Sequence, residues 1–147
     1  MNYINELLSN KLFMNGVYAW AIAQILKTLI HAGVNHQLDL SRLFGDGGMP
    51  SGHSATVTSM AVTAAYTYGL ASPLFAIMAM LAIIVMKDAM GVRLETGKQA
   101  KVINEITNLL DPAEPFSQEH LKEFVGHTPL QVFFGALLGV CVALVAM

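Results

Sequence analysis

The sequence predicts an all-α fold: a small integral membrane helical bundle with about four transmembrane spans and an amphipathic interfacial helix. Composition is the first indication, because 54% of the residues are hydrophobic and only 12% are charged, whereas a soluble domain carries about 25% charged residues. The second indication is a set of four apolar segments, each close to the roughly 20 residues that a helix needs to cross a bilayer. A length of 147 residues suits one domain, so we expect residues 1–147 to form a single membrane-embedded unit.

The four apolar segments define the predicted spans, and a short amphipathic segment of ten residues precedes them. The spans are Leu12–Val34, Ala55–Ser72, Leu74–Val92 and Thr128–Met147. The second span is the most polar, with four threonines and two tyrosines. Because polar side chains avoid lipid and face the interior of a bundle, we expect the second span to lie inside.

The connection between the third and last spans is long and polar. Within it, residues 97–110 place apolar side chains at 102, 103, 106, 109 and 110, which is the spacing of an amphipathic helix. We expect this helix to lie on the membrane surface or against the functional site. The sequence DPAEP at 111–115 is expected to end it.

The last predicted span has residues typical of a helix start and of close helix packing. Thr128 is a suitable N-cap, and Pro129 suits the first turn of a helix. Gly135 and Gly139 form a GxxxG pair that permits a neighbouring helix to approach closely, although a flexible apolar helix would also contain them. The single cysteine, Cys141, offers neither a disulfide nor a cysteine metal site.

The segment before the second span is the strongest functional signal. Residues 47–55 read GGMPSGHSA. A turn that opens a helix directs free backbone N–H groups and the positive end of the helix dipole at an anion. His53 adds a group that gains or loses a proton near neutral pH. The segment therefore predicts a phosphate site with an acid near the leaving oxygen.

Counting membrane crossings places distant polar residues on one face. The first and third spans end at this face, and the second and fourth begin there. Lys27, residues 51–53, Arg93 and His127 all flank these helix ends. Since ionisable groups at membrane depth usually mark function, the topology predicts that these groups share one layer.

Two more ionisable residues lie near this face. Asp88 precedes Arg93 by five residues, and we expect it to form a salt bridge with Lys87, Arg93 or Lys27. His31 follows Lys27 by one helical turn and either faces the site or lies among the lipid headgroups.

Two motifs carry a resemblance to a known family. GGMPSGHSA and GHTPLQVFFGALLG (126–139) resemble the second and third signature motifs of the type-2 phosphatidic acid phosphatase and vanadium haloperoxidase superfamily. The intervening DAMGVRLETGKQAKVINEI (88–106) resembles the divergent, small bacterial-type branch of that superfamily. The resemblance covers most of the chain from Lys27 to Val140, and it implies a phosphatase-like domain that corresponds to the catalytic last four spans of six-span relatives.

The resemblance implies a role for each matching residue. His127 resembles the nucleophile that forms a phosphohistidine intermediate, and His53 resembles the acid that protonates the leaving alkoxide and then the base that activates water. Arg42 would substitute for the arginine of the family's first motif, although the usual Arg-Pro pair is absent. The residues expected to bind phosphate oxygens are Lys27, Ser51, Gly52, Arg93 and Arg42.

Neither a metal nor another cofactor is expected at this site. No set of histidine, aspartate and glutamate residues in the sequence has compact metal-ligand spacing. A phosphate site with cationic side chains does not require a metal.

Two features depart from the family pattern. Arg93 precedes His127 by 34 residues instead of a handful, and Gln131 stands where the family has a carboxylate four residues after the nucleophile. One helical turn allows Gln131 to reach back to His127. The amide oxygen can select the ring tautomer, but it cannot stabilise an imidazolium as a carboxylate does. Glu119 or Glu123 could supply a replacement.

The sequence predicts a membrane phosphatase that hydrolyses a lipid phosphate or diphosphate through phosphohistidine. The alternative is a catalytically weak or silent membrane protein that retains a phospholipid-headgroup pocket. A transporter or channel would need polar residues along a whole span, and in the third and fourth spans such residues are confined to Lys87, Asp88 and Gln131. Hydropathy argues against a soluble haloperoxidase, and a net charge of −2 argues against nucleic-acid binding.

The expected partners are the lipid substrate and membrane lipids. Four short helices leave little shielding for a polar pocket, which favours a homodimer. We expect a bacterial cell membrane as the location. The positive-inside rule predicts that the site faces the cytoplasm. Basic residues gather on the membrane face that carries the site, and only Lys11 lies on the opposite face.

Overall fold

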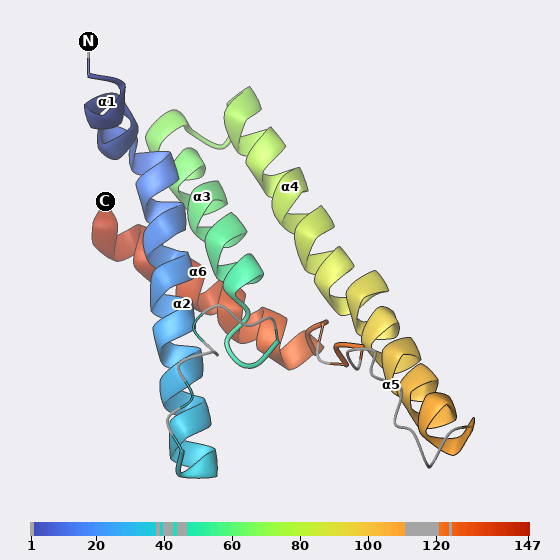
Figure 1. Cartoon of the computed structure of the whole chain (residues 1–147). Helices are drawn as coiled ribbons and strands as arrows, with labels where there is room; N and C mark the ends of the chain where they lie inside the picture. The colour runs from blue at the N-terminus through green and yellow to red at the C-terminus, as the bar shows by residue number, and fades with distance from the viewer. Residues whose placement is uncertain (1, 38, 40–42, 44–46, 111–120, 124) are drawn as a thin grey trace.

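The computed structural model has an all-α fold over the residues that it describes, which confirms the predicted fold class. It describes residues 2–37, 39, 43, 47–110, 121–123 and 125–147. The helices, in chain order, are α1 (Tyr3–Ser9), α2 (Lys11–Asn35), α3 (Gly52–Tyr68), α4 (Pro73–Met90), α5 (Val92–Leu110) and α6 (Pro129–Ala146) (Figure 1). Arg42, predicted to bind phosphate, lies outside the described residues, as does Glu119.

Three of the four predicted spans are long and apolar enough to cross a membrane. Among the described residues these are Lys11–Asn35, Pro73–Thr107, which continues from α4 into α5, and Pro129–Ala146. The remaining predicted span, α3, has 17 residues and packs against α2, α4 and α6. Its polar residues Ser59 and Thr63 are buried, so α3 occupies the interior of the bundle as expected.

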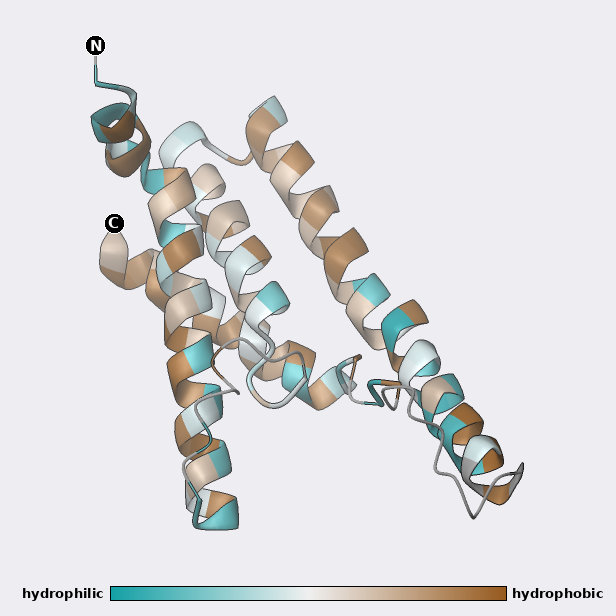
Figure 2. Ribbon diagram, in the orientation of Figure 1, coloured by the Kyte–Doolittle hydropathy of each residue, from teal (hydrophilic) through white to brown (hydrophobic). Residues whose placement is uncertain are grey.

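The polar sequence of α3 is compatible with this place because its hydroxyl groups are hydrogen-bonded inside the bundle. Ser59 donates from Oγ to the carbonyl oxygen of Asn15 on α2 at 3.0 Å. The amide of Asn15 donates to Thr63 Oγ1 at 3.0 Å. Figure 2 shows the resulting contrast, with strongly apolar ribbon along α4 and α6 and paler ribbon along α3.

Local sequence sets where the outer helices begin. Ser72 caps α4 by accepting a hydrogen bond from Phe75 N at 3.2 Å, and a proline occupies the first turn of this helix. Thr128 and Gln131 form a reciprocal capping box at the start of α6. Such caps satisfy N–H groups that a helix leaves without internal partners.

The predicted close approach through the GxxxG pair is present, and α3 is the partner. A Cβ atom at Gly135 would collide with the Ser51 carbonyl oxygen, and one at Gly139 would collide with the Ala55 carbonyl oxygen. Only glycine allows two backbones to pack at this distance. This contact fixes the start of α6 beside the start of α3.

The long polar connection begins with α5, which continues the direction of α4 beyond Gly91 (Figure 1). Figure 2 shows both apolar and polar residues along α5, in agreement with the amphipathic helix predicted for this segment. The Asn104 side chain exchanges two hydrogen bonds with the backbone of Leu121, at 3.0 and 3.1 Å. The returning chain is therefore attached to α5 before it reaches α6.

Candidate functional site

Two histidines from distant parts of the chain meet at one end of the bundle. The ring centroids of His53, in the first turn of α3, and His127, just before the Thr128 cap of α6, lie 5.9 Å apart at an interplanar angle of 63°. The His127 residue is 2% exposed. The close packing of α6 on α3 brings the two rings together. The prediction that the two histidines share one face is thus confirmed.

Gln131 fixes the orientation of the His127 ring. Its Oε1 accepts a hydrogen bond from the backbone N–H of Thr128 at 3.0 Å and lies 3.3 Å from His127 Nδ1. Since the Thr128 N–H is a donor, the atom that faces it is the amide oxygen, which can only accept. This contact favours the hydrogen on His127 Nδ1, and in the neutral ring Nε2 then keeps the lone pair. The predicted contact is present, and its catalytic role stays a prediction.

The backbone around His127 is attached to the junction of α4 and α5. His127 N donates to the Ala89 carbonyl oxygen at 2.9 Å. A Cβ atom at Gly126 would collide with backbone atoms of Leu94 and would come within 2.8 Å of Arg93 C. Arg93 and His127 are therefore neighbours in space although 34 residues separate them in sequence.

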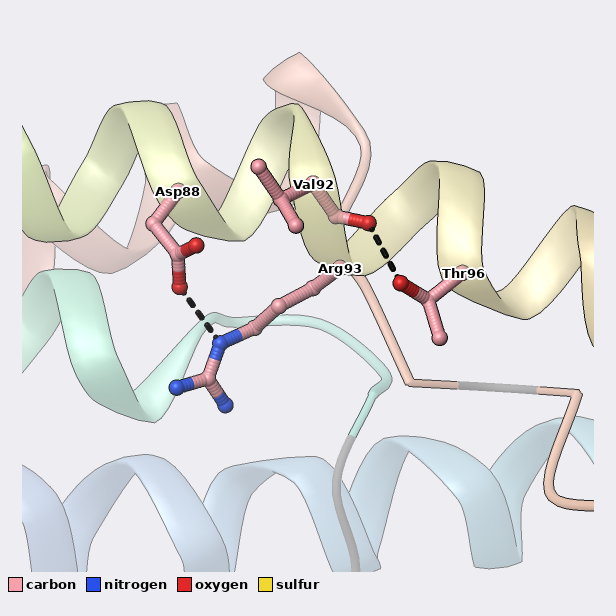
Figure 3. A network of polar contacts seen from close by, with 4 residues as sticks. All are labelled: Asp88, Val92, Arg93 and Thr96. Atoms are coloured by element: carbon pink, nitrogen blue, oxygen red, sulfur yellow. Dashed lines mark hydrogen bonds and ion pairs between the residues drawn. The ribbon is translucent and has the colours of Figure 1, made fainter.

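Arg93 forms a salt bridge with Asp88, which is one of the three pairings predicted for this carboxylate. Its Nε lies 2.6 Å from Asp88 Oδ2, and the two side chains are 42% and 40% exposed. Figure 3 shows the guanidinium turned back beside the carboxylate, with its two terminal nitrogens directed away from the helix that carries it. Because half-exposed pairs contribute little to stability, the main effect of this contact is to orient the guanidinium.

Lys27 lies beneath the glycine-rich turn. The lysine residue is only 6% exposed. Gly48 has a φ of +82°, and a Cβ there would lie 3.0 Å from Lys27 Cγ. The backbone conformation therefore favours glycine at this position, and a Cβ there would also press on the lysine stem. The burial of Lys27 beside a helix start is compatible with the predicted contact with phosphate, which stays a prediction.

Ser51 connects the turn to both helices. Its side chain is fully buried and caps α3, with Ser54 N donating to its Oγ at 3.3 Å. Its own N–H donates to the Gln131 carbonyl oxygen at 3.0 Å. The cap and the bond to α6 hold the N-terminus of α3 in place. The predicted donation of hydrogen bonds to phosphate by Ser51 and by the Gly52 N–H stays a prediction.

Gln24 is a polar residue at the site that the sequence reasoning missed. Its Nε2 lies 3.9 Å from the position a Cβ would take at Gly52. Its Oε1 is buried and has no hydrogen-bond partner within the described part of the chain. The available signal was the spacing, because Gln24 lies one turn before Lys27 in an apolar span.

The remaining site predictions concern carboxylates and metals. Glu123, suggested as a replacement carboxylate, accepts a hydrogen bond from Asn104 Nδ2 on α5 at 3.0 Å. Over the residues that the structure describes, no group of three histidine, cysteine, aspartate or glutamate side chains is arranged to hold a metal ion.

Comparison with known proteins identifies a family profile and a bacterial relative. A family profile described as "Divergent PAP2 family" matches residues 8–142. The chain is also 41% identical over 151 aligned residues to the "Uncharacterized membrane protein YuiD" of Bacillus subtilis (strain 168), an alignment that covers 95% of this chain and 96% of that protein. No solved structure matches the chain.

Proposed function

The chain belongs to the divergent PAP2 family of membrane proteins, and from this membership we propose that it hydrolyses a lipid phosphate or diphosphate through a phosphohistidine intermediate. The observation that carries the proposal is the pair of imidazole rings of His53 and His127, whose centroids are 5.9 Å apart at the N-termini of two helices. This arrangement offers a nucleophile and an acid on either side of one phosphorus atom.

In the first step, His127 Nε2 attacks phosphorus. The bond between phosphorus and the alkoxide oxygen of the lipid breaks, and His53 in its protonated form gives its proton to that oxygen. The hydrogen bond from Nδ1 to Gln131 leaves the Nε2 lone pair for this attack. Lys27, Arg93 and the N-terminus of α3 stabilise the charge on the phosphate oxygens.

In the second step, His53 is neutral and acts as a base. It takes a proton from water while the water oxygen attacks phosphorus, and the bond between phosphorus and His127 Nε2 breaks. Inorganic phosphate leaves, and both histidines return to their starting protonation states.

Substrate class and location follow from the place of the site at a helix end of a membrane bundle. A phosphate bound there belongs to a molecule whose hydrocarbon tail stays in lipid, such as a phosphatidate or a polyprenyl diphosphate. We propose a bacterial cell membrane as the location, with the site towards the cytoplasm because Lys98, Lys101 and Lys122 follow α4 on that face. A homodimer would shield the polar end of the bundle.

The test measures phosphate release from a panel of lipid phosphates in detergent, together with retention of labelled phosphoryl group on the protein. His127→Ala should lower turnover by about 10³-fold or more and abolish the labelled intermediate. His36→Ala, at an exposed histidine, is the matched control and should leave turnover unchanged. Vanadate should inhibit, and EDTA should not. Full activity in the His127→Ala protein would exclude the phosphohistidine step.

The second candidate is a silent protein that binds phospholipid headgroups, and the amide at Gln131 favours it. Binding of phosphatidate by the same preparation, without any phosphate release, would support this alternative and contradict the hydrolase.

A further inference from the structure

Gln24 lies in the candidate site but has no role in the two reaction steps. It is on α2 between Trp20 and Lys27, four residues after one and three before the other, and residues at these intervals share one helix face. Gln24 Nε2 and Trp20 Cδ1 lie 3.9 and 3.7 Å from the position that a Cβ atom would take at Gly52. This face of α2 therefore packs against the residue that precedes His53 at the start of α3.

The bundle does not satisfy the Gln24 side chain. Three buried side-chain atoms in the described part of the chain have no hydrogen-bond partner, and two of them, Gln24 Oε1 and His31 Nδ1, belong to residues one turn on either side of Lys27. Both residues lie in a helix that is long and apolar enough to cross a membrane, where polar side chains are costly and usually functional. Since a buried polar atom without a partner lowers the stability of a fold, a structural role does not account for Gln24.

Asn15 shows how a structural amide is accommodated between the same two helices. It lies on α2 and is 2% exposed. Its Nδ2 donates to Thr63 Oγ1 at 3.0 Å, and the Thr63 hydroxyl donates to the Ser59 carbonyl oxygen at 2.8 Å. Asn15 thus joins α2 to α3 by a side-chain hydrogen bond, whereas the oxygen of Gln24 joins nothing in the described residues. The two amides therefore form a matched pair for comparison.

The amide of Gln24 is oriented as an anion-binding group would be. Its oxygen is buried, and its nitrogen lies near the start of α3, where free backbone N–H groups and the positive end of the helix dipole gather. The amide nitrogen carries two N–H donors and no charge. Lys27 follows one turn later on the same helix and is a cation. A donor and a cation from one helix face, opposite the N-terminus of another helix, suit a tetrahedral anion.

We propose that Gln24 is a further phosphate-binding residue, whose Nε2–H group donates a hydrogen bond to an oxygen of the phosphate bound between Lys27 and His53, an inference that rests on the proposed function. Either a lipid headgroup or free inorganic phosphate supplies such an oxygen. Gln24 gains and loses no proton in this role. Because the hydrogen bond is present in the ground state as well as in the transition state, it lowers KM more than it raises kcat.

Trp20 provides a native reporter of occupancy, because it is the single tryptophan of the chain and lies beside Gly52. The experiment follows its fluorescence in the detergent-solubilised full chain during three titrations. The probes are inorganic phosphate, a phosphonate analogue of dioleoyl phosphatidate, which cannot be hydrolysed, and dioleoylglycerol, which lacks the phosphate. A response to the phosphonate alone would identify the lipid headgroup as the ligand, and a response to inorganic phosphate as well would show that phosphate suffices. No response beyond that to dioleoylglycerol would overturn the proposal.

Two substitutions at Gln24 test the donated hydrogen bond. Gln24→Met keeps the length of the side chain without its donors, and Gln24→Glu keeps its shape and adds a negative charge. The Kd for the dioleoyl phosphonate should rise about tenfold in Gln24→Met and further in Gln24→Glu. KM for dioleoyl phosphatidate should rise in the same order, with kcat little changed. A Gln24→Glu protein that binds the phosphonate as tightly as the wild type would mean that residue 24 accepts a hydrogen bond, and would overturn the proposal.

Thermal unfolding separates a binding role from a structural one. Gln24→Met should keep or raise the unfolding midpoint, because it removes a buried oxygen that has no partner. Asn15→Leu is the matched control: it removes the bond to Thr63, so it should lower the midpoint and leave the Kd for the phosphonate unchanged. A Gln24→Met protein that loses as much stability as Asn15→Leu would make Gln24 a structural residue and contradict the binding role.

Failure of the Gln24 role and failure of the proposed function give different results. A wild-type protein that releases no phosphate, yet binds the phosphonate more tightly than Gln24→Met does, keeps the binding role and loses the hydrolase. A wild-type protein that hydrolyses dioleoyl phosphatidate with the same KM as Gln24→Met keeps the hydrolase and loses the binding role.

Discussion

Replacement of Gln131 by glutamate tests whether the missing carboxylate limits the reaction. The two side chains have nearly the same shape, so a carboxylate oxygen can take the place of Oε1. It would then accept from His127 Nδ1, now 3.3 Å away, and from the Thr128 N–H, now 3.0 Å away. Glutamate would keep the capping box that Gln131 already forms with Thr128, at a helix N-terminus that favours negative charge. Helix stability should therefore be preserved.

The expected gain follows from the charge that develops on His127. Attack on phosphorus turns the ring into a phosphorylated imidazolium, whose Nδ1–H becomes a charged donor. Hydrogen bonds that involve a charged group contribute about 1.5–3 kcal/mol, and we place the amide acceptor towards the lower end of this range and the oppositely charged carboxylate nearer the upper end. The difference of about 1 kcal/mol corresponds to a rate about fivefold higher for Gln131→Glu.

The assay compares kcat for a lipid phosphate in detergent with the thermal unfolding midpoint of the same preparations. Thr128→Ala is the matched control, because it removes the cap at a cost of about 1 kcal/mol and leaves the amide oxygen of Gln131 beside His127. Gln131→Met removes the acceptor and should lower kcat. An unchanged or lower kcat for Gln131→Glu at equal thermal stability would refute the reasoning, and wild-type activity in Gln131→Met would refute the orienting role.

Two further predictions concern packing and phosphate binding. Gly139→Ala should destabilise the protein by roughly 1–3 kcal/mol, because its Cβ would meet the Ala55 carbonyl oxygen, whereas Gly33→Ala in open space should stabilise α2 by about 0.5–1 kcal/mol. Thermal unfolding in detergent measures both, and equal midpoints would show that α6 does not need glycine against α3. Arg93→Gln should raise KM for a lipid phosphate about tenfold, and Asp88→Asn should raise it less, with unfolding midpoints near the wild type because the pair is half exposed. A loss of thermal stability without a change in KM would make this pair structural.

The sequence predicted the meeting of His53 and His127 because a membrane permits few topologies. Each apolar span reverses the direction of the chain, so residues at alternate helix ends must share a face. The same reasoning placed Lys27 and Arg93 at that face. It also predicted that the polar second span would be internal, where Ser59 and Thr63 are now seen hydrogen-bonded.

Side-chain partners were less predictable, because they depend on how each helix rotates about its own axis. Asp88 had three candidate cations in the sequence, and the fold decides for Arg93. The spacing could have placed Gln24 beside Lys27, but the lack of a partner for its Oε1 depends on how the helices pack, which no local pattern describes. The tautomer of His127 likewise depends on a second hydrogen bond, from Thr128 to the same amide oxygen.

Arg93 and His127 lie close together although a long segment of chain separates them. Three backbone contacts position His127: Gly126 against Leu94, His127 N to the Ala89 carbonyl oxygen, and Gly135 against Ser51. None of these contacts involves a side chain of the inserted segment. Since backbone packing at glycines tolerates neither a larger residue nor a shift, the insertion can vary in length and sequence while the imidazole keeps its place. The sequence position of the arginine is therefore a poor guide to the chemistry, and the glycines at 126 and 135 are a better one.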